Sequence, residues 1–195
     1  MSNRGFTLLE MMVAVAIFTM VMGTIFAISL GFANAAEVQE IKITTTDEAR
    51  RAFLAMTPVL RQAIRQTINW DDLPGDSITF RVPVDISGNG WVIDPNGQVE
   101  MSDPITVQRD VNDANDDGIT MSQLVLVTSD EVRVLANDLQ EDAAPNDADD
   151  EIPEGVGFWV VPRNGGLDVT IRAEGTTRRG QVYTTTITEF ILPRN

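Results

Sequence analysis

Asp113, Asn115 and Asp117 lie at alternate positions of "DVNDANDDGIT" and are followed by a glycine, which gives the pattern D-x-N-x-D-G. Alternate side chains of such a segment can converge on one ion, and the glycine permits the sharp turn of a calcium loop. Leu124 stands where the closing acid of an EF-hand would be, so Asp110, Asp116 or a distant acid would have to complete the shell. The segment predicts either a Ca²⁺ site or a solvated acidic turn.

Glu10 is a single carboxylate near the head of a strongly apolar segment. No charged residue follows it from Met11 to Ala36, and a helix that spans a bilayer needs about 20 apolar residues. A carboxylate in that position costs free energy unless it lies near water or meets a partner. Two interpretations follow: Glu10 is a solvated flank residue, or it is one half of an ion pair in apolar surroundings.

Composition excludes several classes of chemistry. The 195 residues include no cysteine and no histidine, which excludes disulfides, zinc sites of the Cys/His type and Ser–His or Cys–His nucleophiles. The net charge of -15 argues against a nucleic-acid partner. A second acidic segment, from Glu141 to Gly155, is interpreted as a solvated loop. Since no catalytic constellation is visible, we predict that the protein is not an enzyme.

Three interpretations compete for the first 36 residues. A secretory signal peptide would be cut near Ala35, but its apolar stretch is usually about 7–15 residues long. A plain signal anchor would remain uncut. In the third interpretation a short polar leader ends at Gly5, and the apolar segment follows the cut.

The stretch "RGFTLLE" resembles the prepilin cleavage motif of type IV pilins and type II secretion pseudopilins. The resemblance implies cleavage by a prepilin peptidase between Gly5 and Phe6, and methylation of the new amino terminus at Phe6. It also implies that Glu10, the fifth residue of the mature chain, pairs with the amino group of a neighbouring subunit. The expected location is the inner membrane, with one span and a periplasmic C-terminal head, and then the pilus or pseudopilus.

The rest of the chain predicts an amphipathic helix followed by strands. Apolar residues recur three or four positions apart, at Ala49, Phe53, Met56, Leu60, Ile64 and Ile68. A helix unbroken from Phe6 to Thr67 would be about 90 Å long. Thr45 with Glu48 suggests a capping box that restarts the helix, and Pro58 suggests a first-turn proline or a kink.

Six short segments read as strands: "SITFRVPV", "SQLVLVTS", "EVRVLAND", "GVGFWVVP", "LDVTIRA" and "QVYTTTITEFIL". In the last, Tyr183, Ile187 and Phe190 are expected in the core. "RNGG" and "TTRRG" are typical of hairpin connections. Trp70, Trp91 and Trp159 are expected to be core residues.

The predicted fold class is α+β, with a long N-terminal helix, half transmembrane and half amphipathic, packed on an antiparallel β-sheet head. The predicted divisions are a leader at 1–5, a membrane and filament helix at 6–36, an amphipathic helix with its connection at 37–75, and a β-rich head at 76–195.

The second half is similar to the larger W-type minor pilins and J-type pseudopilins, and the lack of cysteines departs from many major pilins. The resemblance implies a minor pilin or pseudopilin, with other minor pilins or pseudopilins and the major pilin as partners. It leaves open whether the assembly is a type IV pilus or a type II secretion pseudopilus. The alternative function is a membrane-anchored periplasmic domain that binds calcium or another ligand and does not polymerise.

Overall fold

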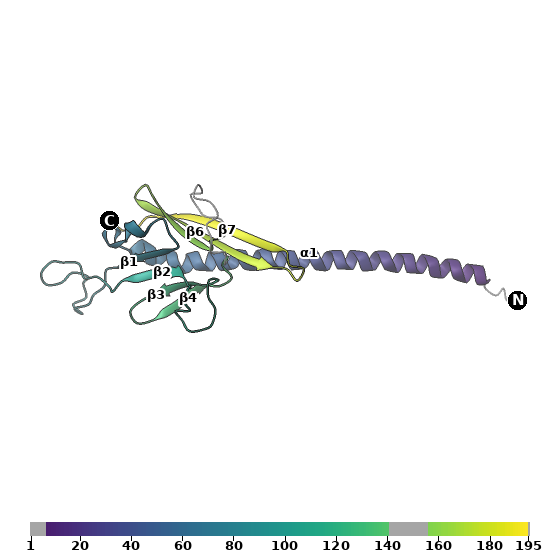
Figure 1. Cartoon of the computed structure of the whole chain (residues 1–195), viewed down its shortest axis with the longest axis horizontal. Coiled ribbons are helices and arrows are strands. Elements are labelled where there is room, and N and C mark those ends of the chain that lie inside the picture. Colours follow the sequence, from purple (N-terminus) through teal and green to yellow (C-terminus); the bar gives the residue numbers. More distant parts are fainter. Residues whose placement is uncertain (1–6, 141–155, 195) are drawn as a thin grey trace. The chain divides into compact units, whose positions relative to one another are not determined.

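The computed structural model describes residues 7–140 and 156–194. The chain divides into two compact units between Glu40 and Ile41. The first unit is helical, and the second contains the end of the same helix and the strands of the described residues (Figure 1). The expected α+β class, a long N-terminal helix packed on antiparallel sheets, is confirmed.

Helix α1 runs from Leu8 to Gln62 without interruption. Its 55 residues correspond to about 80 Å at 1.5 Å per residue. The helix does not restart at Thr45, whose hydroxyl instead donates to the Lys42 carbonyl at 3.2 Å and bonds the Thr185 hydroxyl at 2.9 Å. Pro58 lies inside the helix, not in a first turn.

Two short 3-10 helices follow α1 and turn the chain towards the sheets. They are η1 (Arg65–Thr67) and η2 (Trp70–Asp72). The helix therefore ends before Thr67, and the buried Ile68 belongs to the connection that follows the helix.

The strands form two antiparallel sheets. The first has the order β1-β2-β3-β4, with β1 (Ser77–Phe80), β2 (Ile105–Arg109), β3 (Leu124–Val127) and β4 (Val132–Ala136). The second has the order β5-β6-β7, with β5 (Phe158–Arg163), β6 (Gly166–Thr176) and β7 (Val182–Ile191). Strand β2, with sequence "ITVQR", was missed by the sequence interpretation because it is short and partly polar.

Both predicted hairpin connections are present in the second sheet. Asn164 and Gly165 have φ values of 46° and 81°, the pair of positive φ angles that a tight hairpin turn requires. The expectation that Phe190 joins the core is wrong, since its side chain is 47% exposed. Side chains alternate along β7, so Tyr183 and Ile187 share one face and Phe190 lies on the other.

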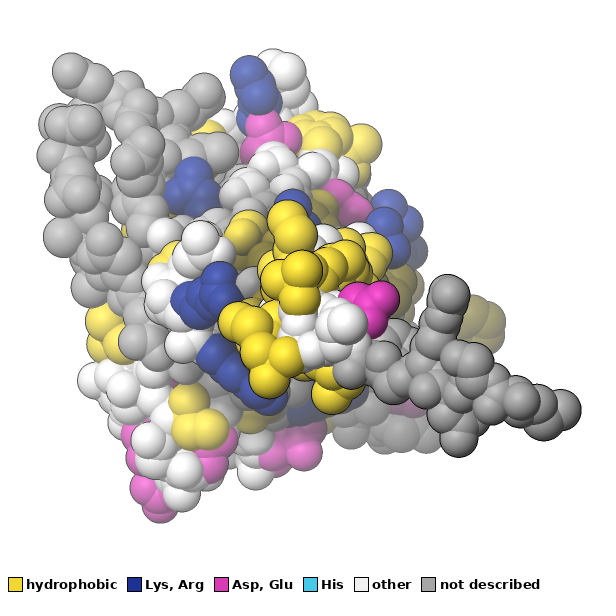
Figure 2. All heavy atoms as spheres, turned by 90° about the vertical axis from the view of Figure 1, so that its right-hand side faces the viewer, with side chains coloured by type: hydrophobic (Ala, Val, Ile, Leu, Met, Phe, Trp, Pro, Cys, Tyr) yellow, Lys and Arg dark blue, Asp and Glu magenta, His cyan; other side chains and the backbone are white. Residues whose placement is uncertain are grey.

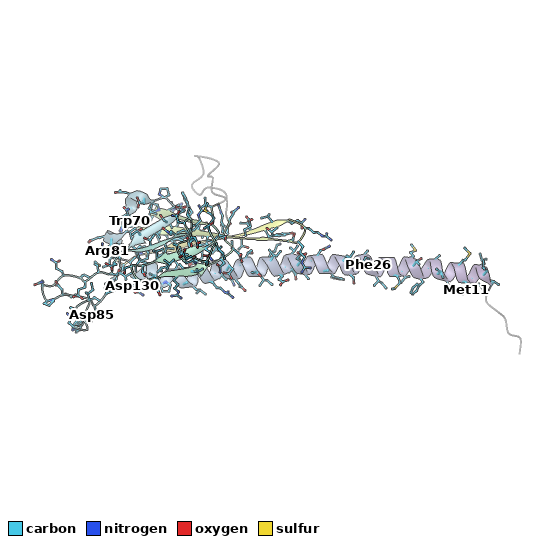
Figure 3. The ribbon with its side chains drawn as sticks, turned by 60° about the horizontal axis from the view of Figure 1, so that its bottom comes forward. Met11, Phe26, Trp70, Arg81, Asp85 and Asp130 are labelled. Carbon is cyan, nitrogen blue, oxygen red and sulfur yellow. The ribbon has the colours of Figure 1, made fainter. Side chains whose placement is uncertain are left out.

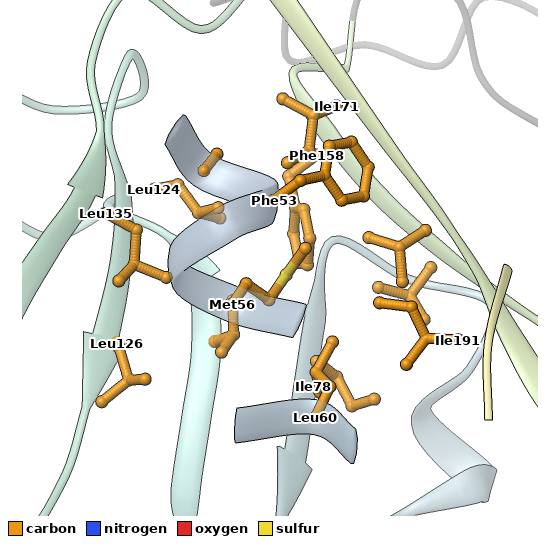
Figure 4. Close-up of a cluster of buried hydrophobic side chains, with 14 of the residues drawn as sticks. Phe53, Met56, Leu60, Ile78, Leu124, Leu126, Leu135, Phe158, Ile171 and Ile191 are labelled. Atoms are coloured by element: carbon orange, nitrogen blue, oxygen red, sulfur yellow. The ribbon is translucent and has the colours of Figure 1, made fainter. Parts of the chain in front are cut away.

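The core is built around the second half of α1. Figure 4 shows Phe53, Met56 and Leu60 on the helix, with side chains of both sheets directed at them from either side. The first sheet contributes residues such as Leu124 and Leu135, and the second contributes residues such as Phe158, Ile171 and Ile191. The predicted amphipathic stripe is confirmed from Ala49 to Leu60.

Trp91 is 74% exposed, which contradicts its expected place in the core. It belongs to the segment between β1 and β2, where Asp85 accepts the N–H groups of Asn89 and Gly90 at 3.1 and 2.7 Å. Polar side chains thus satisfy the backbone of this segment without burying its aromatic residue. Trp70, by contrast, packs against the core.

Leu60 and Leu54 form a matched pair for testing the core. Leu60 is fully buried, whereas Leu54 on the same helix is 75% exposed. Leu60→Ala should lower the free energy of unfolding by about 2–5 kcal/mol, because it removes contacts and leaves a cavity. Leu54→Ala should change it by about 0.5 kcal/mol or less. Urea denaturation of the detergent-solubilised chain measures both, and equal losses would contradict the assigned helix face.

Candidate functional site: the N-terminal helix and the acidic loop

Thr7 and Glu10 form a capping box at the start of α1. The Glu10 Oε2 atom accepts the backbone N–H of Thr7 at 2.8 Å and the Thr7 hydroxyl at 3.0 Å. In return, the Thr7 hydroxyl oxygen accepts the Glu10 N–H at 3.3 Å. These bonds satisfy backbone donors that the first turn of a helix otherwise leaves open.

The capping box changes the interpretation of Glu10. The carboxylate has a partner within its own chain, and the spacing T-x-x-E in "TLLE" is a signal that the sequence interpretation overlooked. Within the described residues, Oε1 of Glu10 receives no hydrogen bond. One oxygen therefore caps the helix while the other remains available to a further donor.

The first part of α1 exposes an apolar surface on all sides. Its large hydrophobic side chains between Leu8 and Phe32 are 47% to 81% exposed. Met11 and Phe26 project freely from the helix in Figure 3, and Figure 2 shows hydrophobic side chains around the helix end nearest the viewer. By length and composition this helix can cross a membrane, with a mean hydropathy of 2.4 over its most apolar window.

The predicted processing residues Gly5 and Phe6 lie outside the described residues. A family model described as the prokaryotic N-terminal methylation motif matches residues 1–26, which include both of them and Glu10. Comparison with curated proteins and with solved structures gives no significant match. The motif and the apolar helix together support a subunit of the type IV pilin or pseudopilin type, anchored in a membrane.

The acidic loop between β2 and β3 is held by its own hydrogen bonds. The Asp113 carboxylate accepts the N–H groups of Asp117 and Gly118 at 2.9 and 3.1 Å. Asp117 Oδ2 accepts side-chain N–H groups from Gln123 at 2.8 Å and from Asn115 at 2.9 Å. The bond from Gln123 contributes most to lowering the pKa of Asp117 below its usual value.

Asp110 begins this loop from a fully buried position. Its Oδ1 accepts the Ala114 N–H at 2.8 Å, and its Oδ2 is buried without a partner among the described residues. The structure joins Asn115 to Asp117, but in the part of the chain that it describes no three acidic side chains converge as metal ligands. Calcium binding at Asp110, Asp113, Asn115 and Asp117 stays a prediction. The second acidic segment, Glu141 to Gly155, lies outside the described residues.

Calcium binding by the loop predicts a gain in thermal stability of the full-length protein. At a free Ca²⁺ concentration of 100 times Kd, the gain should be about 2.7 kcal/mol relative to a sample with chelator. Asp117→Ala should remove most of that gain, whereas Asp103→Ala, at an exposed position outside the loop, should keep it. Equal melting with Ca²⁺ and with chelator would instead identify the loop as a hydrogen-bonded acidic turn.

Proposed function

We propose that this chain is a minor pilin or pseudopilin, a structural subunit that assembles into a type IV pilus or a type II secretion pseudopilus. The observation that carries the proposal is the methylation motif at residues 1–26, together with a helix from Leu8 whose first apolar side chains are exposed among the described residues. Assembly, and not turnover of a substrate, is the proposed activity. The proposed partners are a prepilin peptidase, other minor pilins or pseudopilins, and the major pilin.

Burial of the apolar helix would drive both membrane insertion and assembly of the subunit. Burial of apolar surface is worth about 25 cal/mol per Å², so the side chains from Leu8 to Phe32 require an apolar environment. The inner membrane provides it before assembly, and the helices of neighbouring subunits provide it afterwards. The head would lie on the periplasmic side, and it would move away from the membrane when the helix leaves the membrane for the filament.

Glu10 is proposed to set the position of each subunit against its neighbour. Cleavage after Gly5 would create a positively charged amino group at Phe6, and a neighbour's group of this kind is a natural partner for a carboxylate in an apolar bundle. The capping box occupies Oε2 and holds the side chain in place, while Oε1 is open to such a donor. Capping and pairing are therefore compatible in one residue.

Processing is the first step to test. The mature protein should begin at N-methylated Phe6 in mass spectrometry, and Gly5→Leu should leave the leader attached. Ser2→Ala, in the leader but outside the predicted cut, is the control and should be processed normally. A mature chain that begins after Ala35 would identify a secretory signal peptide and overturn the proposal.

The pairing role of Glu10 can be separated from its capping role. Glu10→Gln keeps an oxygen for the Thr7 N–H but removes the charge, and losing one partner of a buried pair costs about 3–5 kcal/mol. It should therefore be inserted and cleaved, yet crosslink to co-expressed pilin partners at least about a hundredfold more weakly.

Thr7→Val is the matched control. It removes the capping hydroxyl, at a cost of about 0.5–2 kcal/mol, but keeps the carboxylate, so crosslinking should largely survive. If Glu10→Gln crosslinks as strongly as the unchanged protein, the carboxylate has no pairing role. That result would favour the alternative, an anchored domain that does not polymerise.

A further inference from the structure

A groove runs between the second half of α1 and strand β7. Its volume is about 880 Å³, within the range of about 300–1,000 Å³ that is usual for binding sites. Phe53, Pro58 and Ile187 give it an apolar lining. All the lining residues belong to the unit that begins at Ile41.

The groove exists because the second sheet stops short of covering the helix. On the side of β5 and β6 this sheet meets other chain segments, through bridges of Gly75 with Val160 and of Leu139 with Ala173. On the other side, β7 pairs with β6 alone among the described strands. As far as the described residues go, the backbone groups on the outer edge of β7 can therefore pair with another strand.

The groove contains one buried hydroxyl without a hydrogen-bond partner and two exposed basic side chains. The Thr57 hydroxyl oxygen is buried without a hydrogen bond to any described residue. Arg50 and Arg61 are exposed, and neither forms an ion pair within the described part of the chain. Leu54, between them on the helix, is 75% exposed.

We propose that this groove binds an extended, acidic segment of another protein, which adds as a strand to the free edge of β7. Such a strand would continue the order β5-β6-β7 over the uncovered face of the helix. Its inward side chains would cover Leu54 and Pro58, and its backbone would pair with β7. A polar group of the same strand would supply a partner for the Thr57 hydroxyl.

The lining of the groove has two basic residues, Arg50 and Arg61, against one acidic residue, Glu189, so its net charge favours an acidic occupant. Arg50 and Arg61 are about 16 Å apart along the helix axis, which a strand of about five residues spans. Carboxylates near the two ends of the segment would reach both arginines, and charge-assisted hydrogen bonds of this kind are the strong ones. Each copy of this protein carries a net charge of -15, so repulsion between copies favours a different chain as the partner. The inference does not require that the protein polymerises.

A pair of synthetic peptides tests the proposal on the full-length protein in detergent. The first alternates valine and threonine over five residues with an aspartate at each end, and the second has lysines in place of the aspartates. The aspartate peptide should bind in fluorescence anisotropy, and the lysine peptide should bind at least about tenfold more weakly. Hydrogen exchange should show added protection of β7 amides with the aspartate peptide.

Variants of the groove identify the contacts. The double variant Arg50→Ala and Arg61→Ala should weaken binding of the aspartate peptide by about tenfold or more, which corresponds to about 1.4 kcal/mol. Thr57→Val should also weaken binding without lowering the melting temperature, because it removes a buried hydroxyl that has no partner. Arg133→Ala, an exposed arginine on β4, is the matched control and should bind normally.

Four results would overturn the proposal. They are equal binding of the two peptides, unchanged binding by the double arginine variant, the absence of added protection in β7, and protection of β7 without peptide in a sample that sediments as a dimer. The last result would assign the groove to a second copy of this chain.

Discussion

The head of this protein depends on one row of helical side chains, from Ala49 to Leu60. Two separate sheets, of four and three strands, direct their apolar faces at that row. Neither sheet could bury its apolar face without the helix, because small sheets need a second layer to be stable. The helix therefore acts as the shared core of the head and also as the continuation of the apolar segment.

The two halves of helix α1 carry different patterns of apolar residues. In its second half the apolar residues form a stripe, since only one part of the surface is covered by sheets. In its first half they surround the helix, as expected for a segment whose environment is itself apolar. Backbone hydrogen bonds run along both halves of the helix except at Pro58, which has no N–H group to donate. The Thr7–Glu10 capping box satisfies donors of the first turn, where a bilayer would supply no partners.

The acidic character of the head is partly structural. Carboxylates of Asp85, Asp94 and Asp113 accept backbone N–H groups within loops that have little apolar burial. Such Asx-type hydrogen bonds hold the backbone of those loops in place, where few apolar contacts do so. Acidic residues in these segments consequently support the backbone whether or not an ion is bound, and their number alone does not define a metal site.

The sequence by itself determined the apolar segment, the position of Glu10, the buried stripe of the helix and most of the strands, because these depend on local composition and on the periods of 3.6 and 2 residues. It could also have predicted the capping box, whose signal is local. Only the tertiary structure decided that the strands divide into two sheets around the helix, that Phe190 faces outward and that Trp91 is exposed. Only the tertiary structure, likewise, created the groove beside β7, since it joins Thr57 and Ile187 from distant parts of the chain. These features depend on pairing and register between distant segments, for which a single sequence carries no local pattern.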